Sequence, residues 1–60
     1  MQPGQLFEID GRLMRVTNVW HDDNGWLRSV VALCLLPRPG EAPWWAIDPV
    51  GVDFRPVTVH

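Results

Sequence analysis

The chain has 60 residues, including five arginines but no lysine, and a formal net charge of −2. A chain of this length is expected to form one domain, 1–60, that buries about 60% of the surface of its unfolded form, with no room for an enzyme cleft beside the core. The weak negative charge does not indicate a nucleic-acid or anionic-membrane partner.

The amino-terminal segment MQPGQLFEID lacks the basic and apolar regions of a signal peptide. The longest apolar run, Val30 to Leu36, is much shorter than a membrane-spanning segment. The single cysteine, Cys34, lies inside that run, and a lone buried cysteine is typical of a reducing compartment. We therefore expect a soluble, cytoplasmic protein that uses no cofactor and contacts no membrane.

Two turn dipeptides organise the first half of the chain. Asp10-Gly11 and Asn24-Gly25 each lie between apolar-rich segments, and both pairs tolerate the positive φ angles of type I′ hairpin turns. They predict an antiparallel meander, because short turns join antiparallel neighbours. The three strands of this meander are predicted at 4–9, 12–20 and 26–36.

The second half begins with a proline-rich loop, PRPGEAP, that ends the third strand. A fourth strand is predicted from Trp44 to Asp48. Its exit, DPVG, suits a tight turn or a single 3₁₀ turn, because Asp48 can accept a hydrogen bond from an N–H ahead of it and Pro49 fixes φ. The last segment, VDFRPVTV, predicts a fifth strand at 52–59 with Pro56 at an edge or a bulge, and we expect the terminal His60 to be frayed.

Side-chain alternation indicates which faces of the sheet are covered. In the second strand, a β-bulge near Thr17 and Asn18 would turn Val19 back toward the core. The third strand is apolar on both faces, which is typical of a strand buried on two sides. We expect that the sheet either curls into a barrel or forms a homodimer that covers the second face. The two sets are Leu27, Val31, Leu33 and Leu35 on one side and Val30, Ala32, Cys34 and Leu36 on the other.

Trp44 and Trp45 are adjacent, so their rings point to opposite faces of a strand. Trp45 has the same parity as Ile47, whereas Trp44 shares its side with Ala46 and Asp48. Because the more apolar side should face the core, we expect Trp45 to be buried and Trp44 to be exposed or covered by a partner. A bulge at the preceding proline would reverse this assignment.

The expected strand order resembles a small Src-homology-3-like barrel, which implies an all-β fold of five antiparallel strands with a 3₁₀ turn before the last. The opening PGQLFEIDGRLMRVTNVWH also resembles the first hairpin of KOW-type and elongation-factor-P-like amino-terminal domains, where Pro-Gly, a short apolar strand, a polar-Gly turn and a V-x-x-V strand recur. This second resemblance covers about a third of the chain. It does not extend to ribosome or tRNA binding, because the chain has no lysine. Peptide binding does not carry over from true Src-homology-3 domains either, because the chain has no tyrosine.

Few residues have catalytic or metal-binding chemistry. Ser29 is the only serine, and its neighbours offer no general base. His21, Asp22 and Asp23 precede the second turn and could bind a divalent ion, but adjacent side chains diverge and no second cluster has metal-ligand spacing. We interpret these three residues as a solvated hairpin tip, and we expect neither catalysis nor a metal site.

Arginine and tryptophan residues indicate a binding surface around the second turn. Trp20 and Trp26 flank this turn, and Arg15 and Arg28 lie on the strands that it joins. Aromatic rings interleaved with arginine can stack on bases and bind phosphates, as in a nucleic-acid module. The competing interpretation is that the arginines pair with carboxylates on neighbouring strands, such as Glu8.

Protein binding is the function that this pattern favours. Tryptophan and arginine are enriched among the residues that contribute most to protein interfaces. The predicted binding residues are Trp20, Trp26, Arg15, Arg28 and Trp44. We expect a non-catalytic module of the kind that a phage, prophage or plasmid makes to bind and modulate a host protein, with nucleic-acid binding as the alternative.

Overall fold

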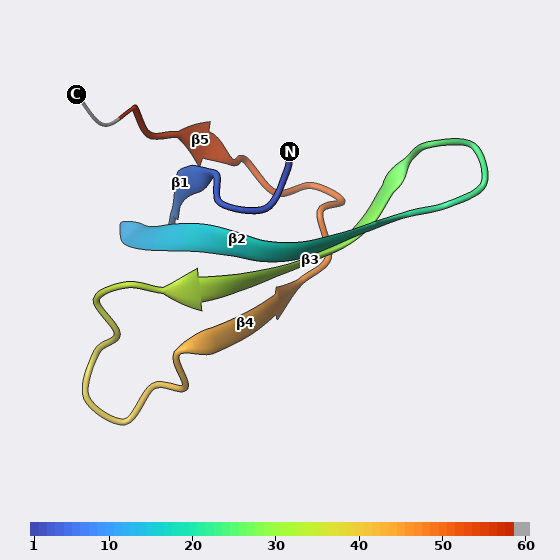
Figure 1. Cartoon of the computed structure of the whole chain (residues 1–60). Coiled ribbons are helices and arrows are strands. Elements are labelled where there is room, and N and C mark those ends of the chain that lie inside the picture. The colour runs from blue at the N-terminus through green and yellow to red at the C-terminus, as the bar shows by residue number, and fades with distance from the viewer. Residues whose placement is uncertain (59–60) are drawn as a thin grey trace.

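The computed structural model describes residues 1–58, which form one antiparallel sheet of five strands and no helix (Figure 1). The all-β prediction is therefore confirmed, and within this part of the chain no helix could cross a membrane. The spatial order of the strands is β4-β3-β2-β1-β5. The strands are β1 (Leu6–Ile9), β2 (Arg12–His21), β3 (Leu27–Cys34), β4 (Trp44–Ile47) and β5 (Arg55–Pro56).

The sheet is not closed, because β4 and β5 lie at opposite edges and do not pair with each other. The predicted barrel is therefore not confirmed. β5 is much shorter than the predicted strand at 52–59. The last residue of that prediction, and the predicted fraying of His60, lie outside the described residues.

The first hairpin turn has the predicted type. Asp10 has φ 50° and Gly11 has φ 74°, and a type I′ turn requires positive φ at both central residues. Asp10 tolerates this left-handed conformation because aspartate can stabilise it with local hydrogen bonds. The turn sets the register between β1 and β2, in which Ile9 pairs with Arg12.

The second hairpin turn differs from the predicted type I′ form. Within it only Gly25 has a positive φ, at 84°. The N–H of Asp22 donates to the carbonyl of Trp26 at 2.9 Å, and the N–H of Gly25 donates to the carbonyl of Asp22 at 3.0 Å. This arrangement matches a three-residue loop that ends in a left-handed glycine. The prediction was wrong because an Asn-Gly pair fits both loop lengths.

The connection from β4 to β5 contains a β-turn, so the predicted tight turn is confirmed and its 3₁₀ alternative is wrong. The N–H of Val52 donates to the carbonyl of Pro49 at 3.3 Å, and Gly51, the third residue of the turn, has φ 74°. That positive φ is typical of a type II turn and is incompatible with a 3₁₀ helix. The carboxylate of Asp48 accepts a hydrogen bond from the N–H of Val50 at 3.1 Å, as predicted.

The core lies on one face of the sheet, where β1 to β4 contribute buried side chains. Phe7 is completely buried and meets the ring of Phe54 edge to face, with centroids 5.1 Å apart. This contact holds the segment before β5 against β1. The predicted burial of Cys34 is confirmed. The buried side chains are Phe7, Met14, Val16, Val30, Ala32, Cys34 and Ile47.

Two β-bulges decide which side chains of the long hairpin reach this core. Val16 pairs with Ala32 and Asn18 pairs with Val31, so Thr17 is the extra residue, as predicted. Val19 consequently packs against the core. The Thr17 hydroxyl donates to the carbonyl of Val31 at 3.0 Å and so fixes the bulge.

The second bulge was not predicted. Trp20 pairs with Ser29 and His21 pairs with Leu27, so Arg28 is the extra residue on β3. An extra residue reverses the alternation of the strand, and Leu27 therefore packs against the core and not on the side predicted for it.

The expectation that β3 is buried on both sides is wrong for the described residues. The register places Arg15, Leu33 and Trp44 side by side on the surface opposite the core, with Val31 on the same side. These four residues and Trp20 define what we call the outer face. Val31 and Leu33 are only half-buried, because the chain has no second layer of structure within residues 1–58.

Replacing Phe7 with alanine tests the importance of the core. We expect Phe7→Ala to reduce the free energy of unfolding by about 3–5 kcal/mol, because the ring is fully buried. A core of this size supplies only about 3–5 kcal/mol in total, so the variant should be largely unfolded. Urea denaturation followed by circular dichroism measures the change. Trp26→Ala, at a position that is 70% exposed, is the control and should shift stability by less than about 0.5 kcal/mol.

Candidate functional site

The outer face presents aromatic and aliphatic side chains on a nearly regular ladder of three strands. Arg15 of β2 pairs with Leu33 of β3, which pairs with Trp44 of β4. Trp44 is 57% exposed and Trp20 is 50% exposed, although both are large apolar residues. Three of the five predicted binding residues, namely Arg15, Trp20 and Trp44, therefore share this surface.

Arg15 is the one arginine that has no ion pair within residues 1–58. The other four arginines each lie within 4.0 Å of a carboxylate, but none of these carboxylates lies on a neighbouring strand as the sequence interpretation expected. Their partners are not the carboxylates of the first hairpin that the sequence suggested. The pairs are Arg12–Glu41, Arg28–Asp22, Arg38–Glu41 and Arg55–Asp53.

The tip of the β2–β3 hairpin is organised by the carboxylate of Asp22. Its Oδ1 accepts hydrogen bonds from the N–H groups of Asn24 and Trp26, both at 2.9 Å. Its Oδ2 accepts a hydrogen bond from Nε of Arg28 at 2.9 Å and lies 2.8 Å from the same guanidinium at Nη2. The hydrogen bond from Trp26 is the main reason that the pKa of Asp22 lies below its usual value, and Asn24 and Arg28 lower it further.

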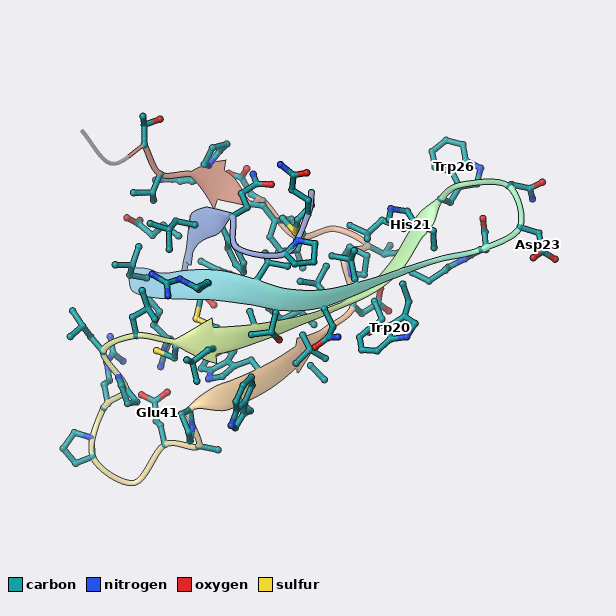
Figure 2. All side chains as sticks on the ribbon, viewed as in Figure 1. Trp20, His21, Asp23, Trp26 and Glu41 are labelled. Carbon is teal, nitrogen blue, oxygen red and sulfur yellow. The ribbon has the colours of Figure 1, made fainter. Side chains whose placement is uncertain are left out.

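The other two predicted binding residues, Trp26 and Arg28, both contact Asp22 at the hairpin tip. The guanidinium of Arg28 is engaged by Asp22. Figure 2 shows Trp20 and Trp26 projecting to opposite sides of the hairpin. The sequence placed both tryptophans around one loop, whereas the structure has them on opposite sides of a hairpin that carries a bulge at Arg28.

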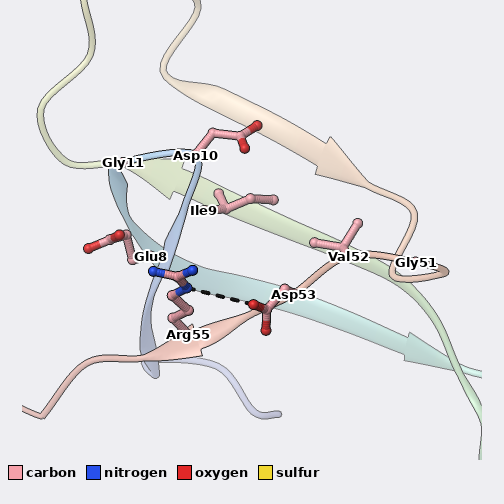
Figure 3. A pocket seen from close by; sticks show the side chains of 8 residues that line it. All are labelled: Glu8, Ile9, Asp10, Gly11, Gly51, Val52, Asp53 and Arg55. Carbon is pink, nitrogen blue, oxygen red and sulfur yellow. Dashed lines mark ion pairs between the residues drawn. The ribbon is translucent and has the colours of Figure 1, made fainter.

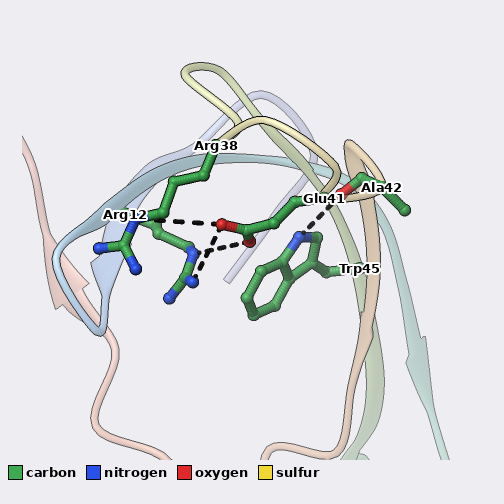
Figure 4. Close-up of polar contacts among 5 residues, drawn as sticks. All are labelled: Arg12, Arg38, Glu41, Ala42 and Trp45. Atoms are coloured by element: carbon green, nitrogen blue, oxygen red, sulfur yellow. Dashed lines mark hydrogen bonds and ion pairs between the residues drawn. The ribbon is translucent and has the colours of Figure 1, made fainter.

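Trp45 lies on the core side of β4, and Trp44 lies on the outer face, as predicted. Trp45 is half-buried against the core cluster. The guanidinium of Arg12 lies 4.9 Å from the centre of its ring, and its indole N–H donates to the carbonyl of Ala42 at 3.2 Å (Figure 4). Trp45 therefore anchors the loop that leads into β4, while the ring of Trp44 is left for other contacts.

Arg12 connects that loop to the first hairpin. Its guanidinium donates two hydrogen bonds to the carboxylate of Glu41, at 3.1 and 3.2 Å, and the paired geometry raises the pKa of Arg12 above its usual value. Arg38 approaches the same carboxylate at 3.9 Å. The sequence alone did not indicate this cluster, because Arg12 and Glu41 are 29 positions apart.

A polar pocket of about 400 Å³ lies between the first turn and the segment that leads into β5 (Figure 3). Arg55 lies 3.6 Å from Asp53 at its rim, and both side chains are largely exposed. Sequence reasoning missed this pocket because residues from opposite ends of the chain form it. Its lining consists of Glu8, Ile9, Asp10, Gly11, Gly51, Val52, Asp53 and Arg55.

No three histidine, cysteine, aspartate or glutamate residues among residues 1–58 are placed to hold a metal ion. At the hairpin tip, where the sequence raised that alternative, both carboxylate oxygens of Asp22 are used within the turn. Comparison with family models, curated proteins and solved structures finds no match for this chain.

The titration of Asp22 tests the organisation of the hairpin tip. The pKa of Asp22 is lower in the folded protein than in the unfolded chain, where it is about 3.9. The stability that the ionised carboxylate contributes is therefore complete above the unfolded pKa and is lost as the pH falls through the folded pKa. We expect the amide protons of Asn24 and Trp26 to shift in NMR spectra with a midpoint below about 3.9. Asp22→Asn should abolish this transition. A midpoint at or above the usual aspartate value would contradict the hydrogen-bond network.

Proposed function

We propose that the protein is a non-catalytic binding module that recognises another protein through its outer face. The observation that carries this proposal is an uncovered sheet surface on which Trp20 and Trp44 are at least half exposed. Tryptophan side chains buried at interfaces contribute disproportionately to affinity, whereas an exposed tryptophan contributes little to the stability of its own domain. A partner that covers this surface would remove both rings from water.

The total surface of the chain supports the same proposal. A folded monomer of 6.9 kDa is expected to expose about 4,000 Å², whereas this chain exposes 4410 Å². The excess is consistent with a sheet that lacks a second layer and with a hairpin that extends beyond the other strands (Figure 1). The exposed area includes the large apolar side chains of Trp20 and Trp44, and clustered apolar surface is typical of an interaction site.

Arg15 adds a specific polar contact to this apolar surface. Arg15 lies in the same row of the ladder as Leu33 and Trp44, and it has no competing ion pair within the described chain. A guanidinium can form a bidentate contact with a carboxylate of a partner or stack on an aromatic ring. The proposed partner is therefore a protein whose surface combines apolar side chains with an accessible acidic residue.

The arginine contacts give nucleic-acid binding less support than the sequence did. Four of the five arginines lie within 4.0 Å of a carboxylate, two of them sharing Glu41, and the formal net charge is −2. Because contacts to phosphate dominate the affinity for nucleic acids, a single unpaired arginine provides little of the attraction that such a module needs. The proposal that the chain is a phage or plasmid product acting on a host protein stays a prediction.

Capture of a partner by variants of the outer face tests the proposal. We expect the tagged protein to retain one stoichiometric partner from a cell lysate, and we expect Trp44→Ala and Arg15→Ala each to weaken capture at least about tenfold, corresponding to about 1.4 kcal/mol or more. Quantitative mass spectrometry of the captured proteins measures the effect. Circular dichroism should show that both variants stay folded, because neither side chain is in the core.

Trp26→Ala is the matched control, because Trp26 is also exposed but lies at the hairpin tip away from the outer face. Capture that depends on Trp26 and not on Trp44 would contradict the assignment of the outer face. Capture of nucleic acid that declines steeply with added salt would replace protein binding with the alternative function.

A further inference from the structure

β4 is an edge strand whose outward-facing backbone groups can be identified from the ladder. The N–H of Cys34 donates to the carbonyl of Pro43 at 2.7 Å, which makes these two residues a hydrogen-bonded pair. In an antiparallel ladder, hydrogen-bonded and non-hydrogen-bonded pairs alternate. Trp45 and Ile47 therefore direct their N–H and C=O groups toward β3, while Trp44 and Ala46 direct theirs away from the sheet.

The opposite edge of the sheet is closed to further pairing. The N–H of Val57 donates to the carbonyl of Leu6 at 3.2 Å, so the neighbouring pair, Phe7 and Pro56, is not hydrogen-bonded. The backbone nitrogen of Pro56 thus faces the free edge and carries no hydrogen. Proline at this position is a known means of preventing edge-to-edge pairing, and β5 is only two residues long.

β4 lacks such protection. Its sequence, Trp-Trp-Ala-Ile, contains neither a charged residue nor a proline. A groove of about 310 Å³ runs beside it and is lined by Glu41, Ala42, Trp44, Trp45 and Ala46. An exposed apolar edge without charge, proline or bulge is a template for another strand.

We propose that two copies of this chain pair antiparallel through their β4 strands and form a continuous ten-stranded sheet. A two-fold axis at Trp45 places Trp44 opposite Ala46 of the second copy, so the N–H and C=O groups of both residues can form four hydrogen bonds between the copies. This register places Trp44, one of the two largest residues of the strand, beside Ala46, the smallest. The two Trp45 residues then face each other across the axis, on the core side, as an aromatic cross-strand pair.

The charges at the two ends of β4 favour this antiparallel arrangement. Before the strand, the cluster of Arg12, Arg38 and Glu41 carries a formal charge of +1 (Figure 4). After the strand, Asp48 supplies a negative charge. An antiparallel dimer brings the positive end of each strand to the negative end of the other, whereas a parallel pair would bring like charges together.

The proposed dimer is independent of the binding function, although the two are compatible. Pairing at the edge uses the backbone of β4 and leaves the outer face uncovered. Because the two-fold axis is perpendicular to the sheet, the outer faces of both copies lie on the same side. Loss of the dimer is thus separable from loss of partner capture.

The variant Ala46→Pro tests the pairing without disturbing the fold. Proline removes the N–H that faces away from β3, so no hydrogen bond between β3 and β4 is lost, and proline is tolerated on an edge strand in this orientation. We expect sedimentation velocity to give twice the 6.9 kDa monomer mass for the wild-type protein. The dimer of Ala46→Pro should dissociate at a concentration at least about tenfold higher.

The control is Ala46→Ser, which retains the N–H and a small side chain and should dimerise like the wild-type protein. In the wild-type protein, hydrogen exchange at the amides of Trp44 and Ala46 should slow as concentration rises, whereas exchange at Trp45 and Ile47 should not depend on dimer formation. A monomer mass at high micromolar concentration would overturn the proposal. Equal dimerisation of the proline variant, or equal weakening by serine, would also overturn it.

Discussion

The structure depends on one packing constraint, which is that a single sheet of five strands can bury only one of its faces. Among residues 1–58 the core comprises seven buried side chains, and Phe7 joins it to the segment before β5 through its contact with Phe54. Every other feature follows from what this layer leaves uncovered. The outer face remains accessible, and the outward edges of β4 and β5 have no neighbouring strand within the described chain.

The two bulges of the long hairpin show how the chain adapts to this constraint. Strict alternation along β2 would place Val19 on the outer face, and the extra residue at Thr17 returns it to the core. The extra residue at Arg28 does the same for Leu27. The bulges increase the local twist, and they leave Trp20 on one side of the hairpin while Trp26 projects to the other (Figure 2).

Local chemistry made much of the strand order predictable, but it did not predict the contacts between segments that are distant in the sequence. Asp10-Gly11 specified the first turn because few dipeptides accept two positive φ angles. The Thr17 bulge and the opposite orientations of Trp44 and Trp45 followed from alternation alone. At the Arg28 bulge, the carboxylate of Asp22 binds both the turn and the guanidinium, and no pattern of apolar residues records that interaction.

In the candidate site, too, some features were predictable from the local sequence and others were not. Exposure of Trp44 was predictable from its parity, whereas the state of each arginine depends on a partner in space. Arg12 is held by Glu41 across 29 positions, and Arg15 has no carboxylate within reach in the described chain. Strand order alone did not predict whether the sheet closes into a barrel, because closure requires that the two edge strands pair with each other. Pro56 has no N–H with which the free edge of β5 could donate a hydrogen bond to β4.

The adjacent tryptophans connect the two proposals. Trp45 contacts Arg12 and the carbonyl of Ala42, while the backbone groups of Trp44 and Ala46 face away from β3 and can pair with another strand. The ring of Trp44 lies at the same time on the outer face. A dimer joined at β4 therefore presents two copies of this ring on one surface. If the partner is itself repeated or dimeric, the second contact forms at a high effective concentration, and weak recognition by each small face becomes strong overall binding.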